Sequence, residues 1–175
     1  MLSLPESSVF GAVLVVHVPF GLACVLTGLV AALSPKRAGP HPRLGATYHW
    51  CLVVVCVTSV ALAGMHWSRD RLLFLLAVVS LGAAGLGRRA ARRARPGWVP
   101  VHILRMSDSY VVLLTAFSLD NAQNLPLWRE LPTVVFWFLP TAVAAPLVVR
   151  ALSRYRTPEP PTADTRLVVR RTGRA

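Results

Sequence analysis

Residues Val9–Leu33 read VFGAVLVVHVPFGLACVLTGLVAAL, an apolar run that contains His17 but no formally charged side chain. A helix of about 20 apolar residues crosses the roughly 30 Å hydrocarbon layer of a bilayer, so this run predicts a membrane-spanning helix. A secretory signal peptide would begin with basic residues and have a shorter apolar stretch, whereas this run follows Glu6. We therefore expect an uncleaved helix, closed by Ser34 and Pro35.

Four further apolar runs follow along the chain. They predict helices over residues 45–65, 72–87, 98–119 and 131–149. The run over residues 72–87 is the shortest, and its flanking arginines would have to reach outward to the headgroups. The sequence thus predicts an all-α integral membrane bundle of five transmembrane helices within residues 1–150. A disordered basic cytoplasmic tail is expected over residues 151–175.

The basic residues divide the connections between these runs into two classes. Fifteen of the 19 Lys and Arg residues fall in the first connection, in the third connection (residues 88–96, expected to be a loop) and in the tail. Three fall in the intervening segments, together with four acidic residues. Because positive residues gather on cytoplasmic loops, we expect the N-terminus outside and the C-terminus in the cytoplasm. A four-pass arrangement would place the third connection or the tail on the wrong side.

Composition separates this chain from soluble and nucleic-acid-binding proteins. It is 54% apolar and 15% charged, whereas a soluble domain has roughly 25% charged residues. A net charge of +12 is typical of nucleic-acid binders, but here the arginines form short clusters between uncharged runs. We expect a multi-pass protein of a bacterial inner (plasma) membrane, with no nucleic-acid partner. Its expected partners are the lipid bilayer and the anionic lipid headgroups that attract the arginines of the tail.

Catalytic motifs are absent from the sequence. No Ser/His/Asp arrangement, paired carboxylates or phosphate-binding loop occurs, so no catalytic residue is predicted and an enzymatic activity is left open. The three cysteines, Cys24, Cys51 and Cys56, lie within apolar runs and form no C-x-x-C pair. We interpret them as small buried hydrophobic residues.

A cluster of ionisable residues opens the fourth predicted helix. Ionisable residues inside membrane spans are costly and are candidates for function. His102, Arg105 and Asp108 follow one another at intervals of three, so successive pairs are neighbours on a helix face. One interpretation is a structural ion pair near the inner interface. The other is that Arg105 meets an anionic group, such as a lipid phosphate or a cofactor carboxylate.

Histidines form a second set of candidates, because facing helices of a bundle commonly supply cofactor ligands. His49 and His102 lie about four residues from the cytoplasmic ends of their helices and are matched in depth for two axial ligands of one haem iron. His17 and His66 differ in depth by roughly 12 Å. Haem b is therefore one candidate cofactor, and interfacial or hydrogen-bonding histidines are the alternative. The candidate cofactor-binding residues are His17, His49, His102 and Arg105, and no metal other than haem iron is predicted.

Two stretches carry a family resemblance. Residues 41–48 read HPRLGATY, similar to an H-R-x-L-G-x-x-Y pattern, and residues 102–110 read HILRMSDSY, similar to an H-x-x-R/W-M-x-x-S-Y pattern. Together with His17 they resemble the predicted membrane proteins of domain of unknown function 2306, over residues 10–150. The family pattern does not include Pro42, His49 or Asp108. The resemblance implies a shared histidine set of His17, His41 and His102, and it implies no activity.

Three functions remain open from the sequence. The first is an inner-membrane protein that binds a lipid-like or redox partner through the His102–Arg105 cluster. The second is a small b-type haem protein in electron transfer. The third is a transporter subunit that uses Arg105 and Asp108.

Overall fold

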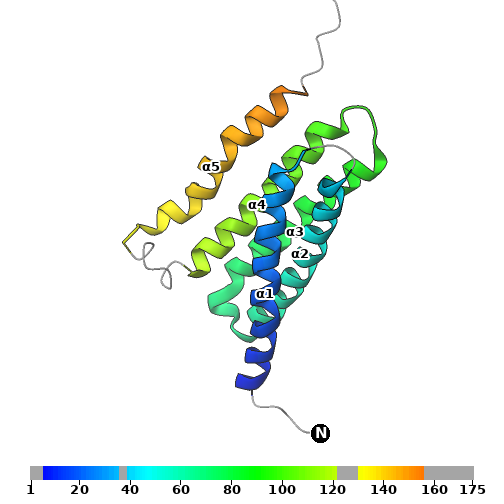
Figure 1. Ribbon diagram of the computed structural model, residues 1–175. Helices are drawn as coiled ribbons and strands as arrows, with labels where there is room; N and C mark the ends of the chain where they lie inside the picture. The colour runs from blue at the N-terminus through cyan, green and yellow to red at the C-terminus, as the bar shows by residue number, and fades with distance from the viewer. Residues whose placement is uncertain (1–5, 36–38, 122–129, 156–175) are drawn as a thin grey trace, which may run out of the picture.

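The computed structural model describes residues 6–35, 39–121 and 130–155, which form helices and no strand. The helices are α1 (Glu6–Leu33), α2 (Pro40–Met65), α3 (Trp67–Arg93), α4 (Trp98–Asn121) and α5 (Thr133–Ser153). Helices α1 to α4 form a bundle in which consecutive helices pack side by side, and α1 also touches α4 (Figure 1). Among the described elements, α5 packs on α4 alone. The predicted all-α fold is confirmed.

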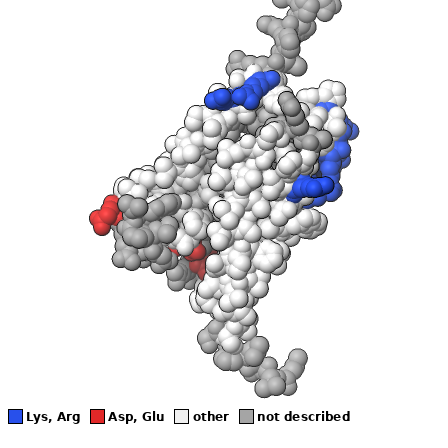
Figure 2. Space-filling model, in the orientation of Figure 1, with Lys and Arg blue, Asp and Glu red and all other residues white. Residues whose placement is uncertain are grey.

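The bundle has two chemically different ends. At one end of the bundle, α1, α3 and α5 finish and α2 and α4 begin. We call this the basic end, and we call the other end of the bundle the opposite end. The start of α1 and the finish of α5 lie at different ends of the molecule (Figure 1). In Figure 2 the Lys and Arg side chains lie at the basic end, the Asp and Glu side chains lie away from it, and an uncharged surface separates them.

Within the described residues, four stretches are long and apolar enough to cross a membrane. They are Ser8–Leu33, Pro40–Met65, Asp70–Arg93 and Thr133–Ser153. The outward faces of α1 and α5 carry many exposed apolar side chains, including Val15 at 73% and Phe138 at 67% exposure. Soluble monomers rarely expose continuous apolar surfaces of such extent, so lipid is the solvent that suits this surface. Helix α4 is not one of the four stretches.

Helix α3 departs most from the sequence-based prediction. It continues to Arg93, so the expected loop over residues 88–96 is wrong for residues 88–93. Ala and Arg are strong helix formers, and the helix ends only where Ala94 takes a left-handed φ of 44° ahead of Pro96 and Gly97. Arginines therefore end the apolar span without ending the helix. The candidate span in α3, Asp70–Arg93, has 24 residues, and these include the arginines at its end.

The other helix boundaries differ by a few residues. Helix α1 begins at Glu6 instead of residue 9, and α2 begins at Pro40 instead of residue 45, which places His41 in its first turn. Proline is tolerated there because the first backbone N–H groups of a helix have no intrahelical acceptor. Helix α5 ends at Ser153, so residues 151–153 of the predicted tail are helical. The remainder of the tail, residues 156–175, lies outside the described residues.

A buried hydrogen-bonded chain joins three helices in the half of the bundle nearer the basic end. The Tyr48 hydroxyl of α2 lies 2.7 Å from the Ser109 Oγ of α4, and the Ser80 Oγ of α3 donates to the Ser109 carbonyl at 2.9 Å. The two serine hydroxyls are 3.3 Å apart. One assignment satisfies every hydroxyl, with Tyr48 donating to Ser109 and Ser109 to Ser80.

Helix α1 joins this chain through a close approach at Gly28. A Cβ atom placed on Gly28 would lie 2.5 Å from Cε2 of Tyr110 and 3.0 Å from Cδ2 of Tyr48. The Tyr110 hydroxyl donates to the Val25 carbonyl at 2.9 Å, which fixes its ring against α1. Small residues let helices approach closely in lipid, and here the missing side chain admits two tyrosine rings.

Candidate cofactor site

Two histidines from different helices face each other at the basic end. The ring centroids of His41, in the first turn of α2, and His102, in the second turn of α4, are 6.4 Å apart. Their planes are nearly perpendicular, at 84°. The indole ring of Trp98 lies 5.9 Å from the His102 ring. Residues 61 positions apart in sequence are therefore brought into one site by the antiparallel packing of the bundle.

Backbone carbonyl groups orient both imidazole rings. The His41 Nδ1 lies 2.9 Å from the Ala31 carbonyl oxygen on α1, and the His102 Nδ1 lies 2.9 Å from the Gly87 carbonyl oxygen on α3. A carbonyl oxygen can only accept, so each Nδ1 carries the hydrogen. In a neutral ring, Nε2 is then the basic nitrogen. Histidines that ligate metals are oriented in this manner, with the other nitrogen donating to a carbonyl or carboxylate.

Close packing of α3 on α4 brings the Gly87 carbonyl within reach of His102. A Cβ atom on Gly87 would lie 3.1 Å from the side chain of Met106 and 3.2 Å from Cβ of Arg105. This position is buried and lies within the part of α3 that the sequence prediction placed at the helix end. The extension of α3 through Arg93 therefore shapes the site, because it keeps Gly87 in regular helix opposite α4.

His17 lies in the other half of the bundle. Its Nδ1 is 2.8 Å from the Thr58 Oγ1 on α2. The Thr58 hydroxyl donates to the carbonyls of Val54 and Val55 at 2.8 and 2.9 Å, so His17 is the donor to Thr58. The structure thus brings together two members of the family-like histidine set, His41 and His102, and places the third in a separate hydrogen bond between α1 and α2.

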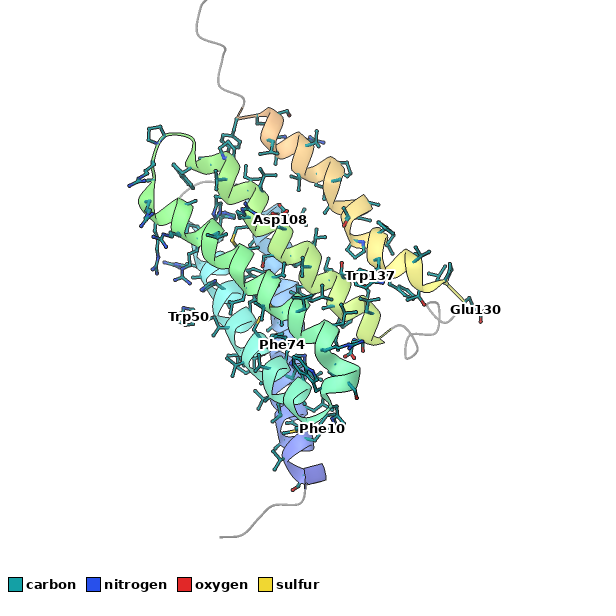
Figure 3. All side chains as sticks on the ribbon, turned by 180° about the vertical axis from the view of Figure 1, so that it is seen from behind. Phe10, Trp50, Phe74, Asp108, Glu130 and Trp137 are labelled. Carbon is teal, nitrogen blue, oxygen red and sulfur yellow. The ribbon has the colours of Figure 1, made fainter. Side chains whose placement is uncertain are left out.

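His49 belongs to a different surface of the basic end. Its ring lies 5.9 Å from that of Trp50, and it lines a groove between α2 and the arginine-rich end of α3. Trp50 lies on the outer side of α2 (Figure 3). The predicted depth-matched pair of His49 and His102 is therefore not the pair that the fold brings into ring contact. Similar depth does not decide which face of a helix a residue occupies.

Arg105 and Asp108 form an ion pair near the surface. Their closest nitrogen and oxygen atoms are 3.6 Å apart, and their side chains are 50% and 53% exposed. Figure 3 shows Asp108 on α4. The pair fits the structural interpretation made from the i, i+3 spacing. Both side chains reach the surface.

The remaining candidate ligands form no metal cluster. Within the described residues, no group of three or more His, Cys, Asp or Glu could hold a metal ion. Cys24, Cys51 and Cys56 are free and buried, as their apolar surroundings in the sequence predict. The thiols of Cys24 and Cys56 donate to backbone carbonyls of neighbouring helices, Tyr48 and Ala77.

Comparison of the chain with protein-family models, with curated proteins and with solved structures finds no match. The resemblance to the family of domain of unknown function 2306 stays a prediction that these comparisons do not test.

His41 is the site residue that analysis of single helices misses. The predicted second helix began at residue 45 and left His41 outside it, so His41 entered a histidine set only through the family resemblance. The two prolines around it, Pro40 and Pro42, are compatible with a first helical turn, and this signal in the sequence could have placed it on the helix. Its contact with His102 on α4 depends on which helices lie next to one another at the basic end, and the sequence of one helix does not determine that.

Proposed function

We propose that the chain is a five-pass protein of a bacterial inner membrane that binds one haem b between His41 and His102 and takes part in electron transfer. In this arrangement the N-terminus is outside and the basic end faces the cytoplasm. The facing imidazoles, each with its Nδ1 hydrogen donated to a backbone carbonyl, are the observation that carries the cofactor proposal.

The position of α4 supports its role as the fifth span. It packs on α3 and α5 and touches α1. Its polar residues Ser109 and Tyr110 bond to groups on the other helices, so these groups need not face lipid. An odd number of spans also agrees with the start of α1 and the finish of α5 at different ends (Figure 1). The arginines of the basic end support a cytoplasmic location for it.

Cysteine labelling in intact cells tests the topology. The native cysteines are buried, so a single new cysteine reports its own position. We expect Asn121→Cys to react with a membrane-impermeant maleimide added outside, and Ala91→Cys to react only after the membrane is opened. Labelling of Ala91→Cys from outside, with Asn121→Cys protected, would contradict the proposed orientation.

His41 and His102 lie close enough to hold one metal ion between them, with ring centroids 6.4 Å apart. Each would bind the metal through Nε2, because its Nδ1 bonds to a backbone carbonyl. Because the described residues offer no third His, Cys or carboxylate ligand, this donor set suits a metal that brings its other ligands with it, as haem iron does. Haem b supplies one-electron redox chemistry at that iron.

The surrounding residues would have distinct roles toward the cofactor. The Nδ1 bonds to Ala31 and Gly87 fix the orientation of the two rings and raise the basicity of Nε2. Arg105 follows His102 by one helical turn and reaches the surface, where a guanidinium can pair with a propionate. Trp98 packs beside His102 and helps to keep its ring in place.

Absorption spectra of protein produced with ample haem test the proposal. We expect a Soret band and sharp visible bands on reduction. His41→Asn and His102→Asn should each abolish these bands, because asparagine keeps a donor near the position of Nδ1 but has no Nε2.

His17→Asn and His49→Asn serve as matched controls, and both should retain the spectrum. Circular dichroism of all four variants separates loss of the cofactor from loss of the fold. A wild-type protein without a Soret band contradicts the haem proposal. Loss of the bands in His49→Asn, with His41→Asn unaffected, contradicts the choice of ligands.

A further inference from the structure

An open groove of ≈460 Å³ lies at the basic end between α2 and α3, away from the His41–His102 pair. Its walls are basic and aromatic. The residues that define its chemistry are His49, Trp50, Arg88, Arg89, Arg92 and Arg93. None of the described residues that line it is acidic. The groove therefore gathers positive charge without a carboxylate in its wall to balance it.

Helix geometry concentrates the arginines on one side of α3. Gly85, Arg88, Arg89 and Arg92 follow the i, i+3, i+4, i+7 spacing of a single helix face. The helix dipole favours basic residues in the last turn of a helix, which explains the positions of Arg92 and Arg93. It does not explain Arg88 and Arg89, which lie a turn earlier. Arg88 and Arg89 lie beside Arg92 at the groove, so positive charge is concentrated where a bound anion would meet it.

One arginine is held in place by an aromatic ring. The guanidinium carbon of Arg88 lies 5.7 Å from the centroid of the Trp50 ring, within the range of a cation–π contact. Tryptophan is also enriched where a membrane protein meets the headgroup layer. The Nδ1 of His49, in the same wall, is buried and has no hydrogen-bond partner within the described residues. The groove thus combines a cation–π contact with a buried imidazole nitrogen that lacks a partner within the described residues.

An apolar surface leads away from the groove toward the opposite end. Val57 follows Trp50 by seven residues on α2, and Val78 precedes Gly85 by seven residues on α3, so each continues its groove face by two helical turns. Both valines are exposed, at 63% and 49%. A charged pocket joined to an apolar surface fits a ligand with an anionic head and an apolar body.

We propose that this groove binds the phosphate headgroup of an anionic phospholipid, whose acyl chains lie along the exposed surface of α2 and α3. Arg88 is positioned by Trp50, and Arg89 and Arg92 supply further contacts to phosphate oxygens. Basic pockets between helices at a cytoplasmic face are suited to phospholipid headgroups, and guanidinium groups match phosphate oxygens well. This inference does not depend on the haem proposal, since the two sites use different residues.

Thermal unfolding of the full chain in phosphatidylcholine nanodiscs tests the proposal. Replacing part of the phosphatidylcholine by phosphatidylglycerol should raise the unfolding midpoint in a saturable manner, because a ligand that binds only the folded state stabilises it. Arg89→Gln/Arg92→Gln should weaken the apparent lipid affinity about tenfold or more, since two phosphate contacts are lost. Arg150→Gln/Arg154→Gln is the matched control, because it removes two exposed arginines at the C-terminal end of α5, at the same end of the bundle. Its apparent lipid affinity should stay close to that of the wild type.

Three outcomes would overturn the proposal. The assignment of the groove as the binding site is wrong if both double variants weaken the lipid-dependent rise of the unfolding midpoint equally, because the effect would then be general charge attraction. The assignment of an anionic phospholipid as the ligand is wrong if phosphatidylglycerol does not shift the unfolding midpoint of the wild-type protein. Millimolar inorganic phosphate, added to discs of phosphatidylcholine alone, separates lipid from free anion. An equal rise in the midpoint with phosphate would assign the site to a soluble anion.

Discussion

The two halves of the bundle are built from the same helices but hold their polar groups differently. Toward the basic end, Tyr48, Ser109 and Ser80 form a buried chain of hydrogen bonds across three helices. Toward the opposite end, the His17–Thr58 hydrogen bond links α1 to α2, and the ring contact of Phe10 with His66 links α1 to the α2–α3 connection. The Tyr48–Ser109–Ser80 chain therefore links three helices, whereas the His17–Thr58 bond links two.

The largest expected difference concerns two glycines of α1. Gly28→Ala places a methyl group against the rings of Tyr110 and Tyr48, which their own hydrogen bonds hold in place. We expect a loss of roughly 1–3 kcal/mol in unfolding free energy, as for other overpacked positions. Gly21→Ala, where a Cβ meets nothing within 4 Å, should be neutral or stabilising, because alanine favours helix by up to about 1 kcal/mol.

Reversible unfolding in detergent measures both glycine variants. Equal stability of Gly28→Ala and Gly21→Ala would mean that the tyrosine rings move aside freely. The close packing of α1 on α2 and α4 would then not be a constraint specific to the half at the basic end.

A second prediction compares one hydrogen bond from each half by double-mutant cycles. Tyr48→Phe with Ser109→Ala should show a coupling of about 1 kcal/mol, near the upper part of the range for bonds between membrane helices. His17→Ala with Thr58→Val should show about 0.5 kcal/mol or less, because that bond is only partly buried. A larger coupling for the His17–Thr58 pair would reverse the comparison between the halves.

The smallest effect is expected at the surface of the half at the basic end. Arg105 and Asp108 are about half exposed, and exposed ion pairs contribute at most about 1 kcal/mol. Arg105→Ala should therefore lower the unfolding free energy by less than about 1 kcal/mol, close to the effect of Arg92→Ala. The two melting curves in detergent measure this difference. A loss of several kcal/mol specific to Arg105→Ala would place the pair within the hydrocarbon layer, where a broken pair leaves an uncompensated charge.

The number and type of the helices could be read from the sequence because apolar runs are local features. The apolar runs did not predict where α3 ends. Arg88 marks the limit of the apolar run, but helix formation depends on backbone hydrogen bonds and propensity, which Ala and Arg sustain to Arg93. The sequence analysis therefore identified the basic connection and misjudged its conformation.

The candidate site was predicted only in part, because a ligand set depends on which helix faces meet. His102 was identified from its cluster, and depth alone then suggested His49 as its partner. The fold places His41 beside His102 and turns His49 toward the groove at α3. Depth along a helix follows from a rise of about 1.5 Å per residue, but the direction of a side chain around the axis is fixed by the packing of its neighbours.

The sequence by itself determined that the chain is all-helical, that its long apolar runs suit lipid, and that its arginines gather between particular runs. These properties follow from composition and from spacing along one segment. Only the tertiary structure decided three arrangements that join different helices. Gly28 admits two tyrosine rings, and the Gly87 carbonyl orients His102. Four arginines of α3 line one groove together with Trp50. Each of these contacts joins residues of different helices, and their distances depend on packing that no single segment encodes.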